Sequence, residues 1–377
     1  MEENKKYIEE LIKEYKENPN RETLSKMNDY YIQTDNYYAI YQVALEGFKY
    51  NESVYYYNAG TYLSNIDRED YDLKRAIEYL EISAKKGSKK ANYRLAELYY
   101  EKKYGVVDYN KSLMYLQEYD RLDGTTSYKH LGLIYYKMRD YKNALKYLLE
   151  AINRGQNLYF YLGYIYSNEN GGYLNYHLAV ECYQKALESE NLASAYNNLA
   201  ILYKNGQGVE KDYQKAFELM SKAYELGSKA AIKNLASYYR NGIGCEVNLQ
   251  KSFELLEEME DKENNPFYFE GLGRTYYCSK NYQKALDAYK KSASMGNKFS
   301  QLEIVLILNE AYKKKINYID DSITKEKIYE MFNELYLEGL KVCETEEFKN
   351  IFFENCLLNS SRDFINERRK IADSRAY

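Results

Sequence analysis

Residues 195–208 read AYNNLAILYKNGQG, and residues 231–244 read AIKNLASYYRNGIG. Between the two stretches, the Ala, Leu-Ala pair, Tyr and two glycines recur with an offset of 36 at every position. Self-similarity at a fixed period of this size is typical of repeat proteins, in which each unit packs mainly on its neighbours. These stretches therefore predict an array of short units.

The second half of the repeated unit carries an Asp or Asn followed four residues later by Ala or Ser. Seven such pairs follow one another at spacings of 32 to 37 residues: Asp72/Ala76, Asp108/Ser112, Asp140/Ala144, Asn175/Ala179, Asp212/Ala216, Asn248/Ser252 and Asn281/Ala285. Asp and Asn side chains accept hydrogen bonds from the free N–H groups of a helix's first turn. A small residue one turn later lets a neighbouring helix approach. Each pair therefore predicts the start of a helix, which we call helix B.

The first half of the unit predicts a second helix, helix A. It carries a Leu or Ala followed by Gly or Ala, and four residues after the first member stands a Tyr or, once, Leu63. Apolar residues at positions i and i+4 lie on one face of a helix. Glycines at 87, 155, 227 and 296 stand where a helix C-cap needs a positive φ. The unit is therefore two antiparallel helices, which must stack on their neighbours to bury their apolar faces.

This pattern resembles the Sel-one-like repeat, a branch of the tetratricopeptide-repeat superfamily. The strongest match is Leu199-Ala-Ile-Leu-Tyr203-Lys-Asn-Gly206-Gln-Gly208-Val209, together with the unit that follows it. Tyr135 and Tyr276 precede their helix B caps by five residues instead of nine, so those two units look like ordinary tetratricopeptide repeats. The resemblance implies an all-α fold, a right-handed superhelical solenoid of antiparallel helix pairs.

We expect three regions along the chain. Residues 1–51 hold N-terminal helices with a degenerate repeat, with helices over 2–16, 21–33 and 36–48. Residues 52–297 hold seven Sel-one-like or tetratricopeptide-like repeats. Residues 298–377 hold divergent C-terminal helices and a cap, with helices expected over 299–312, 324–342 and 346–375.

Composition argues against several classes of function. The formal charge of −4 does not suit a nucleic-acid binder. Neither a secretory signal nor a membrane span is visible, and five scattered cysteines fit reduced thiols, so we expect a cytoplasmic protein. The two histidines, His130 and His177, stand at no recognisable catalytic spacing, and the acidic loop 65–72 lacks the glycine of a calcium loop. We therefore expect no enzyme, cofactor, metal or small-molecule substrate.

The resemblance further implies that helix A lines the concave, inner face of the array. Carried onto this chain, the inward positions are Tyr57, Tyr93, Glu97, Tyr100, Lys129, Tyr136, Phe160, Tyr164, Asn197, Ile201, Lys233, Arg240, Glu270, Arg274 and Tyr277. All of them except Glu97, Ile201 and Glu270 form the predicted partner-binding set. The chain has 49 tyrosines, so compositional drift explains an aromatic face as well as binding does. We expect a protein–protein interaction scaffold that binds a protein or peptide on this face. The alternative is a regulatory or immunity-type protein that wraps and inactivates one dedicated partner.

Overall fold

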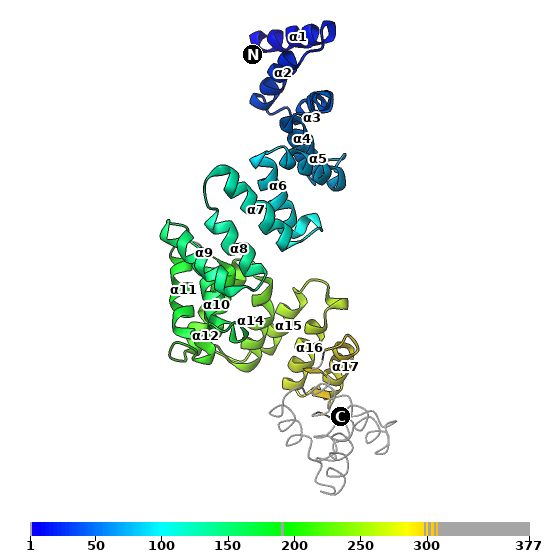
Figure 1. The fold of residues 1–377 in the computed structure, drawn as a ribbon. Coiled ribbons are helices and arrows are strands. Elements are labelled where there is room, and N and C mark those ends of the chain that lie inside the picture. The colour runs from blue at the N-terminus through cyan, green and yellow to red at the C-terminus, as the bar shows by residue number, and fades with distance from the viewer. Residues whose placement is uncertain (1, 190–191, 298, 301–302, 305–306, 308–377) are drawn as a thin grey trace, which may run out of the picture. The chain divides into compact units, whose positions relative to one another are not determined.

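The computed structural model describes residues 2–189, 192–297, 299–300, 303–304 and 307. Within them the chain forms seventeen α-helices, four short 3-10 helices and no strand (Figure 1). The C-terminal helices expected over 324–342 and 346–375, and most of 299–312, lie outside the described residues. The predicted all-α fold is confirmed.

Three helices precede the repeats. They are α1 (Glu2–Glu17), α2 (Arg21–Gln33) and α3 (Tyr37–Gly47), followed by the 3-10 helix η1 (Phe48–Tyr50). Asn20 and Asn36 cap α2 and α3 by accepting hydrogen bonds from Thr23 N and Ala39 N. The three helices agree with those expected from the sequence.

Seven helix A segments and seven helix B segments then alternate along the chain. The A helices are α4 (Ser53–Leu63), α6 (Lys89–Tyr100), α8 (Tyr128–Lys137), α10 (Tyr159–Ser167), α12 (Ala193–Asn205), α14 (Lys229–Asn241) and α16 (Pro266–Cys278). The B helices are α5 (Leu73–Lys85), α7 (Tyr109–Asp123), α9 (Tyr141–Asn153), α11 (Tyr176–Ser189), α13 (Tyr213–Glu225), α15 (Leu249–Glu257) and α17 (Tyr282–Ser294). Besides η1, three short 3-10 helices occur: η2 (Lys102–Tyr104) and η3 (Glu169–Gly171) follow A helices, and η4 (Lys262–Asn264) follows a B helix.

The predicted caps all form. At each of the seven Asp or Asn positions the side chain accepts a hydrogen bond from a backbone N–H three residues later, at 2.8 to 3.3 Å. The four predicted C-cap glycines, Gly87, Gly155, Gly227 and Gly296, have φ between 79° and 86°. The helix boundaries therefore follow from residues that the sequence makes visible.

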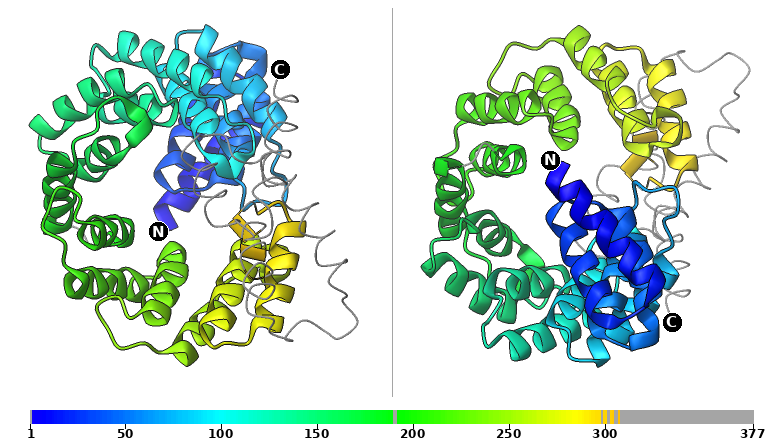
Figure 2. Two further views of the ribbon diagram at one scale, coloured as in Figure 1. Left: turned by 90° about the horizontal axis from the view of Figure 1, so that it is seen from below. Right: turned by 90° about the horizontal axis from the view of Figure 1, so that it is seen from above.

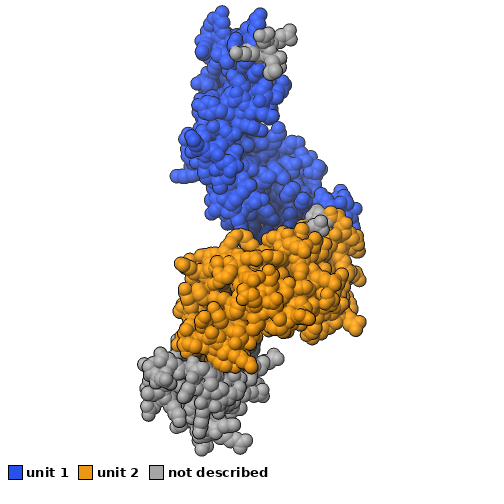
Figure 3. All heavy atoms as spheres, turned by 180° about the vertical axis from the view of Figure 1, so that it is seen from behind, with its two compact units in different colours: residues 1–174 blue, residues 175–377 orange. Residues whose placement is uncertain are grey.

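The chain divides into two compact units, residues 1–174 and 175–377 (Figure 3). Within each unit, consecutive helices pack side by side, and each core cluster joins neighbouring helices (Figure 2). In unit 1, for example, Ala96, Leu116, Leu131 and Ile134 form one buried cluster between α6, α7 and α8. The core is thus a series of local clusters, as a solenoid requires.

Several tyrosines at the helix A position that follows the Leu-small pair belong to these cores. Tyr99 stacks on Tyr115 with ring centroids 5.9 Å apart, and Tyr135 stacks on Tyr147 at 5.5 Å. In unit 2, Tyr239 and Tyr276 contact Phe217 and Phe253 of the preceding helix B. Part of the tyrosine enrichment therefore serves packing between helices.

Candidate functional site

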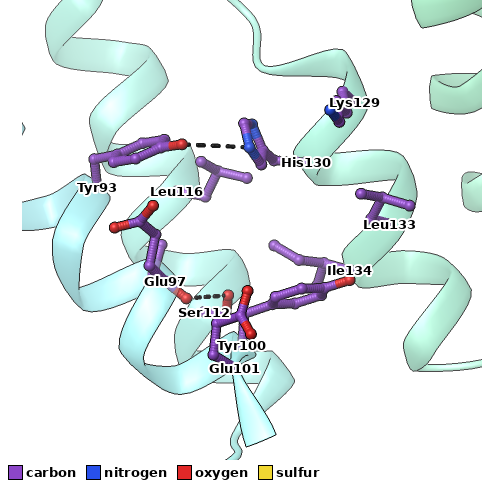
Figure 4. A pocket seen from close by; sticks show the side chains of 11 residues that line it. Tyr93, Glu97, Tyr100, Glu101, Ser112, Leu116, Lys129, His130, Leu133 and Ile134 are labelled. Carbon is purple, nitrogen blue, oxygen red and sulfur yellow. Dashed lines mark hydrogen bonds between the residues drawn. The ribbon is translucent and has the colours of Figure 1, made fainter. Parts of the chain in front are cut away.

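Helices α6 and α8 enclose a pocket of about 180 Å³ in unit 1 (Figure 4). On α6, positions 93, 96, 97 and 100 share one face because they are three or four residues apart. On α8, positions 129, 130, 133 and 134 likewise lie on one face of the helix. The two faces lie opposite each other, and α7 supplies Ser112 and Leu116 behind them. The pocket is therefore built by two successive A helices and the helix B between them.

The floor of the pocket is apolar and fixed. Leu116, Leu133 and Ile134 are buried. The small side chain of Ala96 leaves room above them, and the hydroxyl of Ser112 donates to the Ala96 carbonyl at 2.8 Å. Because that hydroxyl is already hydrogen-bonded, the floor offers apolar surface and shape complementarity to a ligand.

An aromatic pair closes one side of the pocket. The Tyr93 and His130 rings meet edge to face with centroids 5.6 Å apart, and the Tyr93 hydroxyl lies 3.3 Å from His130 Nε2. Desolvation by the surrounding atoms, with a smaller contribution from Lys129, lowers the pKa of His130. Desolvation likewise raises the pKa of Tyr93. Both groups are therefore held neutral at neutral pH, and the neutral imidazole can accept the tyrosine proton in a hydrogen bond.

Tyr100 forms the opposite part of the wall. Its ring meets that of Tyr109 edge to face at 6.1 Å, and burial strongly raises the pKa of its hydroxyl. Around the mouth lie Glu97, Glu101 and Lys129, of which Glu97 pairs with Arg94 at 3.2 Å. An apolar floor with neutral aromatic walls and charges at the rim suits the binding of one apolar side chain.

A second aromatic group lies between α8 and α10. The Tyr136 ring meets the rings of Tyr161 and Tyr164 edge to face at 5.1 and 5.4 Å, and Tyr161 also contacts Phe160. Tyr164 is 39% exposed, so the group presents one ring to solvent. Tyr136, Phe160 and Tyr164 were predicted from repeat positions, whereas Tyr161 was not, because it stands between two inward positions.

In unit 2 the predicted side chains form polar contacts with one another. Asn197 is buried and accepts from Asn234 Nδ2 at 3.0 Å. Glu270 is also buried and pairs with Lys233 at 3.5 Å and with Arg274 at 3.4 Å. These contacts join successive A helices through their inward positions.

The remaining predicted residues of unit 2 lie beside this network. Arg274 also pairs with Glu303 at 3.5 Å, and Tyr277 meets Tyr282 edge to face at 5.5 Å. Arg240 is only 6% exposed, and its guanidinium donates to Ser237 of its own helix at 3.0 Å. Burial, with the nearby Arg274, lowers the pKa of Arg240. Tyr57, the last predicted residue, lines a separate hollow of unit 1.

The structure adds pocket residues that the sequence reasoning missed. His130, which the sequence analysis considered only for catalysis, is an exposed residue of α8 that contacts Tyr93 one repeat earlier. Leu133 stands two residues after the Leu131 of its repeat, which is an inward position, and that spacing could have identified it. Ser112 and Leu116 come from helix B, and no inward-position rule includes them.

The described residues hold no group of three or more His, Cys, Asp or Glu side chains that could bind a metal ion. Among the same residues, no helix is both long and apolar enough to cross a membrane.

The repeat pattern is matched by the sequence model of the Sel1 repeat over more than half of the chain. The matched segments are residues 38–88, 89–118, 129–156, 158–191, 193–228, 229–263 and 267–297. The chain therefore belongs to the Sel1 repeat family, and the resemblance noted from the sequence is confirmed. Comparison with curated proteins by sequence found no match.

A solved structure gives the same fold. The chain is similar to c5321, a protective antigen of uropathogenic Escherichia coli with an SLR fold, at 20% identity and a TM-score of 0.60, covering 93% of this chain and 79% of that one. It also matches a Sel1 repeat protein from Oxalobacter formigenes at 20% identity and a TM-score of 0.49, covering 83% and 89%. At these identities the likeness concerns the fold alone: an α-solenoid of helix pairs.

Proposed function

We propose that this chain is a non-enzymatic interaction scaffold that holds a protein or peptide on the helix A face of unit 1. Proteins built from such repeats generally serve as scaffolds for protein–protein interaction. The observation that carries the proposal is the pocket between α6 and α8, where Tyr93, Tyr100 and Leu133 surround about 180 Å³ of space. That volume is smaller than typical small-molecule sites, so it suits one anchoring side chain of a larger partner.

The chemistry of the pocket favours binding over catalysis. Ser112 donates its proton to a backbone carbonyl, and His130 is engaged with Tyr93, so neither pairs with the other as nucleophile and base. Binding energy in protein interfaces concentrates in a few aromatic and apolar anchors that occupy desolvated pockets. The neutral Tyr93 and Tyr100 hydroxyls add hydrogen-bonding groups beside the apolar floor.

Filling the pocket tests this function. In the Leu133→Trp variant the larger ring would occupy the space that an anchor needs, since Leu133 lines the pocket. The matched control is Leu149→Trp on α9, where the leucine is exposed and lies outside the pocket. Wild-type and variant chains would be used as bait in the native cell extract, and captured proteins quantified by mass spectrometry.

We expect the wild type and Leu149→Trp to retain the same partner and Leu133→Trp to lose it. Melting curves establish that each bait is folded. The purified partner is then titrated against all three baits. Equal affinity for the two tryptophan variants would exclude the pocket as the anchoring site.

A further inference from the structure

A larger hollow of about 830 Å³ lies in unit 1, apart from the pocket just described. It is lined by the end of α2, the start of α3, one face of α4, the loop that follows α4, α6 and the 3-10 helix η2. Its volume falls within the range of established ligand sites. Tyr57 is the one residue of the predicted binding set that lines it.

Four large apolar side chains stand exposed around this hollow. Ile32, Tyr37, Val54 and Ile66 are 47%, 54%, 38% and 45% exposed, and all four line it. They come from α2, α3, α4 and the loop after α4. Exposed apolar groups that gather in this way indicate a binding surface, whereas single exposed apolar residues are ordinary.

Positively charged side chains outnumber negatively charged ones around the hollow. Arg68, Lys90, Arg94 and Lys103 line it together with only two carboxylates, Asp35 and Asp67. Arg94 is used within the protein, because it donates to Ser64 Oγ at 2.9 Å and pairs with Glu97 at 3.2 Å. Lys90 and Lys103 are exposed, which leaves a cationic surplus facing the hollow.

Arg68 is the most informative of these cations. Its guanidinium lies 4.4 Å from the Tyr62 ring centroid and 5.4 Å from that of Tyr37, so two rings hold its plane in place. Among the described residues, no carboxylate lies within 4.0 Å of it. Its Nε is buried without an acceptor, and the buried hydroxyl of Thr61, which also lines the hollow, has no partner either. Buried polar atoms without partners cost free energy, so a ligand that supplied the missing bonds here would gain affinity from them.

We infer that this hollow binds a short peptide segment in which an Asp or Glu stands beside apolar residues. The carboxylate accepts from the Arg68 guanidinium, which is suited to bidentate pairing with carboxylates, and from the Thr61 hydroxyl. The apolar side chains of the segment then pack on Ile32, Val54 and Ile66. This inference deepens the proposed function and rests on it, since it names the chemistry of the partner at a second site.

The lining favours a peptide over a nucleic acid. Single-stranded nucleic acids bind to continuous basic tracks with aromatic rings on which bases stack. Here three of the four exposed apolar groups are aliphatic, so they offer few faces on which bases could stack. An acidic and apolar peptide matches both the cationic surplus and the aliphatic rim.

The test uses the full chain and a library of short random peptides displayed on phage. The wild type, Arg68→Gln and Arg75→Gln are each panned, and the recovered peptides are sequenced. Arg75 is the matched control, because its guanidinium also lies over a tyrosine ring, that of Tyr79 at 5.9 Å, but it does not line the hollow. Recovered peptides are then synthesised and titrated by fluorescence anisotropy, with and without a uridine oligonucleotide as competitor.

We expect peptides enriched in Asp or Glu beside Leu, Ile, Val or Phe. Loss of a charge-assisted bond should weaken their binding to Arg68→Gln by about tenfold or more, while Arg75→Gln binds like the wild type. Thr61→Val is a second variant: it replaces the unpartnered hydroxyl by a methyl group, so it should keep its melting temperature and lose affinity. It keeps the test decisive should Arg68→Gln fail to fold.

Several results would overturn the inference. They are the recovery of no peptide, the recovery of neutral or basic peptides, equal affinity for Arg68→Gln and the wild type, or displacement by the oligonucleotide. Leu133→Trp separates the two sites. A natural partner that is lost from Leu133→Trp but kept by Arg68→Gln supports the proposed function and refutes this inference.

Discussion

Gly244 lies where two repeats of unit 2 approach each other through their backbones. It follows α14, has a φ of 68°, and an added Cβ would lie 2.6 Å from the Tyr213 carbonyl carbon and 2.8 Å from Phe217 Cβ at the start of α13. Gly208 makes the equivalent approach one repeat earlier, against Tyr176 and His177. The sequence predicts a tight turn at these glycines, and the structure adds that the turn also packs on the preceding helix B.

The Gly244→Ala substitution should therefore carry two costs. A left-handed backbone costs an alanine ~1–2 kcal/mol relative to glycine. The overlap with backbone atoms of Tyr213 cannot be relieved by rotating a side chain, so the loop or α13 must shift, at ~1–3 kcal/mol. We expect a total loss of ~2–5 kcal/mol in the free energy of unfolding.

Gly227→Ala is the matched control. Gly227 has a φ of 79°, but an added Cβ there meets nothing within 4 Å. It should lose only the conformational term, ~1–2 kcal/mol. Equilibrium urea unfolding followed by circular dichroism measures both variants, and their difference of ~1–3 kcal/mol isolates the overlap. Equal losses from the two variants would refute the claim that Gly244 is required by close approach between repeats.

Three further predictions concern packing, charge and pH. Ala200 is fully buried, so Ala200→Leu should lower the free energy of unfolding by ~1–3 kcal/mol through overpacking. Lys222→Ala removes only an exposed ion pair with Glu225, so it should change that free energy by ~0.5 kcal/mol or less in the same urea experiment. Among the described residues Arg240 has no carboxylate partner, so Arg240→Met should leave the melting temperature unchanged or raised. Arg274→Met removes the partner of Glu303 and one of the two cations that pair with Glu270, so it should lower the melting temperature; the reverse order would contradict these pairings. Burial raises the pKa of Tyr55 and of Tyr268 to about 12, from 10.0 in the unfolded chain. Their stabilising contribution is complete below pH 10 and is lost as the pH rises to about 12, so circular dichroism and phenolate absorbance should change together in that window.

Helix boundaries could be predicted from the sequence because single residues determine them. Asp108 caps α7 by accepting from Lys111 N, and Gly87 ends the turn after α5 with a φ of 82°. Both interactions involve atoms within a few residues of each other. Their residue types therefore signal the structure without any knowledge of distant contacts.

The binding site could be predicted only in part, because neighbours one repeat away decide what an inward side chain does. Tyr93 and Tyr100 occupy two of the predicted inward positions of one repeat, and both line the pocket. Arg240 occupies the same repeat position as Tyr100, yet it is buried beside α16. Repeat spacing assigns a direction to a side chain, whereas its exposure depends on the size of the residues that face it.

The distribution of unmet hydrogen-bonding capacity explains why we place recognition in unit 1. In unit 2 the inward charges and amides largely bond to one another: Glu270 pairs with Lys233 and Arg274, and Asn197 with Asn234. A partner that binds there would have to replace bonds that already exist, and such an exchange contributes little to the free energy of binding. Unit 2 has exceptions: Arg240 has no carboxylate partner among the described residues, and the buried Tyr238 hydroxyl and Arg274 Nε have no hydrogen-bond partner there. The contrast between Arg240→Met and Arg274→Met measures the first of them.

The hollow of unit 1 contains buried polar atoms that lack partners within the fold. Arg68 Nε and Thr61 Oγ1 are buried without partners, and the apolar rim around them is exposed to water. A ligand that supplies a carboxylate and apolar side chains gains new bonds there without breaking old ones. Tyrosine enrichment alone could not identify this surface, because the same residue type fills the packing between Tyr99 and Tyr115. Exposure distinguishes the two roles, since Tyr99 is buried in the packing between helices, whereas Tyr37 is 54% exposed beside the hollow.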